Sequence, residues 1–207
     1  MTETSVPPYL HDTWGFKKYG GTWCFEAQVL QSPGRYLAGL STLAKALEGI
    51  GRIARVEIVS PDPTPRLQRL EAPSAGSLAL DDVRAFVEGF GGEISLVSVL
   101  IDLFAYVRTE KNGEPKRMWV REPTEVALWA NDDKAGLQPQ VCLSMEHTLF
   151  QESSRQGVDN RELYWKNRSI LSELLDRLRA HFGPLAEYED GVEPTGYPPP
   201  TDEEGDT

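Results

Sequence analysis

The chain has 207 residues, 40% of them aliphatic, aromatic or Cys, and a formal net charge of −11. This length and apolar content fit one globular domain with a packed core. The charge is concentrated at one end: residues 183–207 hold eight acidic residues and no Lys or Arg, which leaves 24 acidic and 21 basic residues in 1–182, a net of −3. Because nucleic-acid backbones bind clustered Lys and Arg, we expect no nucleic-acid partner.

Membrane and secretion signals are also missing from the sequence. No run of about 18 apolar residues is free of charges, so we expect no membrane-spanning helix. The start, MTETSVPPYL, has neither a basic segment nor an apolar core of the kind found in signal peptides. The two cysteines, Cys24 and Cys142, form no CxxC pair, and we interpret them as reduced thiols of a bacterial cytoplasmic protein.

The N-terminal part predicts a β-α-β unit. Residues 1–13 are expected to be a flexible arm in front of a single globular domain, 14–182. Alternating apolar residues predict a strand over 22–30. Ser32-Pro33 is a helix start signal, so a helix is expected from residue 33 to residue 48. A second strand is expected over 53–59.

A proline-rich stretch follows this unit. Residues 60–77 contain four prolines and are expected to be a mobile loop without a regular element. Apolar residues at helical spacing then predict a short helix over 81–90.

The centre of the chain predicts an antiparallel meander of four strands within residues 94–149. Apolar side chains occupy every odd position from Val97 to Val107, and Asn112-Gly113 is a strong signal for a two-residue hairpin. That hairpin would pair Val107 with Met118 and Phe104 with Arg121. Further strands are expected over 124–130 and 138–149.

The last helix carries a continuous apolar stripe between Leu163 and Phe182 and ends at Gly183-Pro184. We expect it to pack on the apolar face of the sheet, although the same stripe could form a dimer seam. Residues 183–207 are expected to be a disordered, acidic, proline-rich tail. The predicted fold class is therefore α+β, with a mainly antiparallel sheet of five or six strands and a long C-terminal amphipathic helix packed on it.

The search for reactive groups gives no catalytic residue, no metal ligand set and no cofactor motif. Asp102, Glu114 and Lys116 resemble a metal-nuclease pattern, but the hairpin register places the two carboxylates about 23 Å apart, too far to share a metal ion. His147 falls on the same face as Leu143 and Met145, and we interpret it as a core or rim histidine with a satisfied hydrogen bond.

The second sheet face carries a different kind of residue. We expect aromatic side chains and an arginine to gather there, which is the composition of a binding hot spot. These candidate partner-binding residues are Phe104, Tyr106, Trp119, Arg121 and Trp129. The alternative is that the helices over 33–48 and 81–90 cover this face and make it a second core layer.

From these features we expect a non-catalytic protein-binding domain, monomeric or homodimeric, whose partner is another protein such as a toxin or enzyme. Its most concrete form is an immunity or antitoxin-like protein that inhibits the partner. One alternative is a small-ligand-binding or hydrolase-type enzyme with a site near Asp102, Glu146 and His147. A second alternative is a structural homo-oligomer built through the C-terminal helix.

Overall fold

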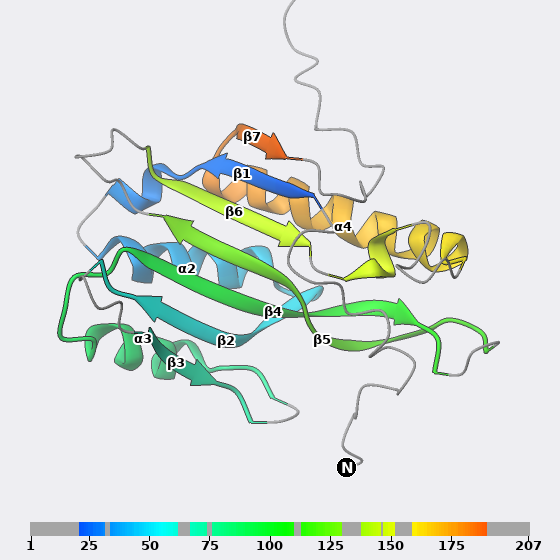
Figure 1. The fold of residues 1–207 in the computed structure, drawn as a ribbon, viewed down its shortest axis with the longest axis horizontal. Helices are drawn as coiled ribbons and strands as arrows, with labels where there is room; N and C mark the ends of the chain where they lie inside the picture. Colours follow the sequence, from blue (N-terminus) through cyan, green and yellow to red (C-terminus); the bar gives the residue numbers. More distant parts are fainter. Residues whose placement is uncertain are drawn as a thin grey trace, which may run out of the picture.

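The computed structural model describes residues 21–31, 34–61, 67–73, 76–109, 113–129, 138–145, 147–151 and 159–189. They form one seven-stranded antiparallel sheet in the order β3-β2-β4-β5-β6-β1-β7, with the helices behind it (Figure 1). The strands are β1 (Thr22–Glu26), β2 (Gly51–Val59), β3 (Leu67–Glu71), β4 (Leu96–Val107), β5 (Lys116–Trp129), β6 (Gln140–Met145) and β7 (Leu185–Glu189). The helices are α2 (Arg35–Ala46), α3 (Leu80–Glu88) and α4 (Arg161–Phe182), with 3-10 turns η1 (Gln28–Gln31) and η2 (Thr148–Phe150). The predicted α+β class is confirmed.

One hydrophobic core lies between the sheet and the helices. The odd-numbered residues of β4 from Val97 to Val107 are fully buried, and so is most of the apolar stripe of α4. The packing of α4 on the sheet is therefore confirmed. Helix α2 lies beside α4 on this same face, where Arg177 of α4 donates hydrogen bonds to the carbonyl oxygens of Ala46 and Glu48. Val83 and Val87 of α3 belong to the same core.

The first helices therefore do not cover the second sheet face, which was the alternative considered from the sequence. The expected β-α-β unit is also spread across the sheet, because β4, β5 and β6 separate β1 from β2. The crossover helix α2 is amphipathic, so it can bury its apolar side over these intervening strands as well as over its immediate neighbours.

Two edge strands appear where irregular chain was expected. Strand β3 lies inside the proline-rich stretch 60–77 and pairs with β2; it falls between Pro65 and Pro73, so no proline interrupts its ladder. Strand β7 lies in the segment expected to be a disordered tail and pairs with β1. The arm 1–13, the signal Ser32-Pro33, Asn112 and the tail beyond residue 189 lie outside the described residues.

Within its described residues the central meander contains three strands in place of the four expected, because β5 is one strand of 14 residues. Near the hairpin the register differs from the prediction by two residues: Val107 pairs with Lys116 and Phe104 pairs with Trp119. A bulge between Ile101 and Leu103 takes up two extra residues of β5, and beyond it the register agrees with the prediction. Since two is an even number, every paired side chain keeps its predicted face.

Candidate protein-binding face

The sheet face that points away from the helices, here named the open face, carries the candidate site (Figure 1). Direct cross-strand pairing assigns side chains to it, because paired residues of antiparallel strands project to the same side. Its central members are Arg52, Arg55, Glu57, Val59, Leu67, Arg69, Glu71, Leu96, Ser98, Leu100, Asp102, Phe104, Tyr106, Arg117, Trp119, Glu125, Ala127 and Trp129. These residues form three zones: an ion-pair network, an aromatic pair and an apolar row.

The ion-pair network begins at the bulge between β4 and β5. Asp102 is 4% exposed, and its carboxylate accepts hydrogen bonds from Arg52 Nη2 at 2.8 Å and from the backbone N–H of Glu122 at 3.0 Å. Glu122 has a φ of +49°, in the left-handed region that residues with a Cβ rarely adopt. The carboxylate of Asp102 therefore holds the bulge in place and neutralises Arg52.

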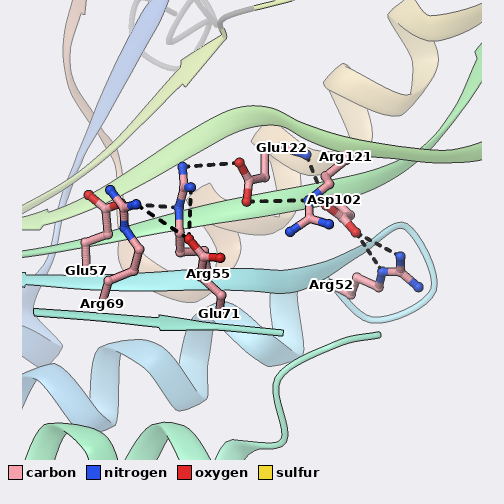
Figure 2. A network of polar contacts seen from close by, with 8 residues as sticks. All are labelled: Arg52, Arg55, Glu57, Arg69, Glu71, Asp102, Arg121 and Glu122. Atoms are coloured by element: carbon pink, nitrogen blue, oxygen red, sulfur yellow. Dashed lines mark hydrogen bonds and ion pairs between the residues drawn. The ribbon is translucent and has the colours of Figure 1, made fainter. Parts of the chain in front are cut away.

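Arg55 stands at the centre of the network, between three carboxylates (Figure 2). Its guanidinium nitrogens lie 3.2 Å from Glu57, 3.4 Å from Glu71 and 3.2 Å from Glu122. Arg69 of β3 lies 2.8 Å from the same carboxylate of Glu57, which links the edge strand to the network. Burial raises the pKa of Glu122 above its usual value, while the nearby guanidinium of Arg55 opposes this effect. The charges in this part of the open face thus compensate one another.

The aromatic pair lies on the hairpin side of the bulge. The ring centroids of Phe104 and Trp119 are 5.2 Å apart, a contact typical of aromatic side chains. The guanidinium carbon of Arg52 lies 4.4 Å from the centroid of Trp119, and that of Arg117 lies 4.9 Å from the centroid of Phe104. Arg117 Nε also donates a hydrogen bond of 3.1 Å to the carbonyl oxygen of Phe104. Two arginines therefore flank the aromatic pair in fixed positions.

The apolar row crosses the other end of the open face. Val59 pairs with Leu67 on one side and with Leu96 on the other, and Leu96 pairs with Trp129. These four side chains consequently form a line across β3, β2, β4 and β5. Leu67 is 55% exposed and Trp129 is 45% exposed, so both ends of the row are open to solvent. Val59 and Leu96 between them are partly buried, and an apolar row with exposed ends is a candidate interaction surface.

The structure separates the residues that the sequence placed in one cluster. Phe104 and Trp119 do meet, whereas Arg121 lies in the bulge, with its Nε 3.9 Å from a carboxylate oxygen of Glu122. Tyr106, the cross-strand partner of Arg117, lies on the same face but is partly buried, with the ammonium of Lys166 from α4 at 5.5 Å from its ring.

Trp129 belongs to the apolar row, ten residues along β5 from Trp119, which corresponds to about 30 Å. Sequence reasoning missed Arg52, Arg55, Arg117 and Leu67. Leu67 was missed because its strand lay within the presumed loop, while the arginines showed no local pattern that distinguished them from solvated charges.

Two of the three groups of the catalytic alternative, Asp102 and His147, lie in different surroundings. Asp102 lies on the open face in its ion pair, whereas His147 is buried and its Nδ1 accepts a hydrogen bond of 3.1 Å from the backbone N–H of Leu149. The prediction of a core or rim histidine with a satisfied hydrogen bond is confirmed, and burial lowers the pKa of His147 to about 3. Glu146 lies outside the described residues.

The described part of the chain contains no group of three or more His, Cys, Asp or Glu residues placed to hold a metal ion. Glu114 is six residues from Val120, the partner of Leu103, so about 20 Å of strand separates it from Asp102. This geometry agrees with the wide separation of the two carboxylates expected from the sequence.

Cys24 and Cys142 form a disulfide bond between β1 and β6, where they are direct cross-strand partners. The expectation of two reduced thiols was wrong. The two residues are 118 positions apart in sequence, and only the alignment of β1 with β6 brings their Cα atoms to 4.0 Å.

None of the helices in the described part of the chain is both long enough and apolar enough to cross a membrane. Comparison of the chain with protein-family models, with curated proteins and with solved structures found no match in any of the three.

Proposed function

We propose that this chain is a non-catalytic protein-binding domain that holds a partner protein against the open face of its sheet. The observation that carries the proposal is the apolar row, in which Leu67 and Trp129 stay more than two-fifths exposed although both lie on strands of the sheet. In its specific form, the chain is an immunity or antitoxin-like protein that inhibits a partner enzyme by covering it.

The size of the open face supports this proposal. The aromatic pair and the apolar row are about 30 Å apart along β5. A protein–protein interface of standard size buries about 800 Å² on each partner, which corresponds to a disc about 32 Å across. Both zones therefore fit within one interface of ordinary size, with Trp129 near one end and Trp119 near the other.

The ion-pair network between the two zones also favours a protein partner. Arg52, Arg55 and Asp102 meet their counter-charges within the chain, so a partner covering them has few unpaired charges to compensate. The aromatic pair and the apolar row would then contact the partner on either side of these internally neutralised charges.

The alternative of a homo-oligomer through the C-terminal helix has less support. The apolar stripe of α4 is buried against the sheet and α2 of the same chain, so it does not present a second apolar seam. Trp165, at 58% exposure, is the large apolar side chain that α4 leaves at the surface. It provides a matched control for Trp129.

The experiment uses the full chain as bait in extracts of its native cells, with wild type, Trp129→Asp and Trp165→Asp compared side by side. We expect wild type and Trp165→Asp to retain the same partner, and Trp129→Asp to lose it. With the purified pair, Trp129→Ala should weaken the affinity by about tenfold or more, because buried aromatic anchors dominate interface energies. Equal affinities for wild type and Trp129→Ala, or a chain that turns over a substrate unaided, would contradict the proposal.

The redox state of Cys24 and Cys142 in cells indicates the compartment in which the chain works. A cytoplasmic location, expected from the sequence, is typical of reduced thiols, whereas a disulfide is typical of oxidising compartments. Alkylation of thiols in intact cells, followed by mass spectrometry, distinguishes a cytoplasmic location from an oxidising compartment. Bonded cysteines would place the chain in an oxidising compartment, and alkylated cysteines would support the cytoplasm.

A further inference from the structure

We propose that Arg117, at the hairpin end of the open face, binds a carboxylate carried by an acidic segment of the partner protein. This inference rests on the proposed function and adds the chemistry of the partner: an Asp or Glu next to an apolar side chain. The apolar row at the far end of the face is a separate anchor, so the two can be tested independently.

The position of Arg117 supports this role. Its Nε is occupied by the carbonyl oxygen of Phe104 and its planar group lies over the Phe104 ring, which orients the side chain while leaving it exposed. Within the described residues no carboxylate lies within 4.0 Å of it, in contrast to Arg52, Arg55 and Arg69 in the network. A guanidinium held by Nε still offers its terminal N–H groups to a carboxylate.

The charge around Arg117 has the sign that an acidic segment requires. Lys116 is its exposed neighbour, and Lys166 of α4 lies over the ring of Tyr106, the cross-strand partner of Arg117. Neither lysine has a carboxylate within 4.0 Å in the part of the chain that the structure describes. On a chain with a net charge of −11, this local excess of positive charge would direct an acidic segment to this end of the face.

The aromatic pair supplies the apolar half of the recognition. Phe104 and Trp119 are both partly exposed and lie next to Arg117, so an aliphatic or aromatic side chain adjacent to the bound carboxylate can pack on them. Arg and Trp, represented here by Arg117 and Trp119, are also residue types that often dominate interface energies.

A library of random peptides displayed on phage tests this chemistry without the natural partner. Phage retained by the full wild-type chain would be sequenced, and a retained peptide would be synthesised for affinity measurement. We expect Asp and Glu to be enriched over the unselected library. Arg117→Gln should weaken the affinity of the chain for this peptide by about tenfold or more, which is the usual effect of losing a charge-assisted hydrogen bond. Arg84→Gln, which removes an exposed arginine of α3, is the matched control and should leave the affinity within about twofold.

Several results would overturn this inference. They include no retained peptide, retained peptides without acidic enrichment, and equal binding to wild type and Arg117→Gln. If the natural partner still binds through Trp129 in those cases, the proposed function stands and only the carboxylate site is wrong.

Two further outcomes would assign the site to a different occupant and so would also reject the proposal. One is binding of a single-stranded oligonucleotide that Arg117→Gln abolishes. The other is peptide binding that appears only after Asp202, Glu203 and Glu204 are replaced by amides, which would identify the acidic tail of the chain itself as the occupant.

Discussion

The carboxylate of Asp102 joins two features that are far apart in sequence: it accepts a hydrogen bond from the backbone N–H of Glu122, and it pairs with the guanidinium of Arg52. The first contact closes the bulge that places Trp119 opposite Phe104. The second holds Arg52 at 4.4 Å from the ring of Trp119. One buried side chain thus sets the geometry of the hairpin end of the open face.

Replacing Asp102 with Ala should lower the free energy of unfolding by about 3 kcal/mol, because Arg52 loses its buried counter-charge and the N–H of Glu122 loses its acceptor. Asp102→Asn keeps an acceptor oxygen and should cost less. Urea denaturation of the three proteins measures these differences. Asp81→Ala, at an exposed position of α3, is the control and should stay within about 0.5 kcal/mol of wild type. An equally small effect of Asp102→Ala would show that the bulge does not depend on this contact.

His147 predicts a defined pH dependence of stability. Its pKa in the folded chain is lowered to about 3 by burial, against 6.5 for an unperturbed histidine. As the pH falls from 6.5 toward 3, the unfolded chain takes up a proton that the folded chain refuses, so stability is lost. His147→Asn keeps an acceptor for the N–H of Leu149 but does not titrate, and the gap in unfolding free energy between wild type and this variant should narrow as the pH falls.

Met145→Ala provides the control for the His147 variant, because it creates a cavity at a buried neighbour without removing a titrating group. Its unfolding free energy should stay below that of wild type by the same amount at every pH. If the difference in unfolding free energy between wild type and His147→Asn were also constant with pH, His147 would not contribute to acid sensitivity.

Replacing Gly39 with Ala should change the stability of the chain in the direction opposite to that expected from helix propensity. Gly to Ala inside a helix normally stabilises it by about 1 kcal/mol. A Cβ at Gly39 would lie 2.8 Å from Leu30 Cδ2 and 2.9 Å from Leu128 Cδ2, both in fully buried side chains. Gly39→Ala should therefore destabilise the chain by about 1–3 kcal/mol in chemical denaturation, since overpacking pushes α2 from the sheet. Gly91→Ala, where a Cβ meets nothing within 4 Å, should be nearly neutral. A stabilised Gly39→Ala variant would refute this close packing.

The disulfide predicts a large redox effect on stability. Cys24 and Cys142 are separated by 118 positions, and closing a loop of this length stabilises a fold by about 4–5 kcal/mol in the chain-entropy account. Unfolding of the wild type with and without a thiol reductant should differ by an amount of that order. The Cys24→Ala, Cys142→Ala double variant should match the reduced wild type and show no response to the reductant. Equal stability of the oxidised and reduced wild type would mean that the bond adds nothing to the fold.

The elements of the core were predictable from the sequence because their signals are local. Periodicity alone predicts the buried side of two segments, the alternating strand from Val97 to Val107 and the helical stripe from Leu163 to Phe182. The hairpin prediction shows the limit of such signals. Its register was wrong by two residues near Asn112-Gly113, yet the faces of the paired residues were right, because an even shift preserves the side of each of them.

The sequence by itself determined the α+β class, the core-facing side of β4 and of α4, and a core or rim position for His147. Only the tertiary structure decided which residues share the open face: the pair of Arg52 and Asp102 spans 50 positions, and the apolar row needs β3, which no local pattern revealed. The physical reason is that periodicity depends on neighbours along the chain, whereas edge-strand pairing, bulges and ion pairs depend on which segments meet after folding.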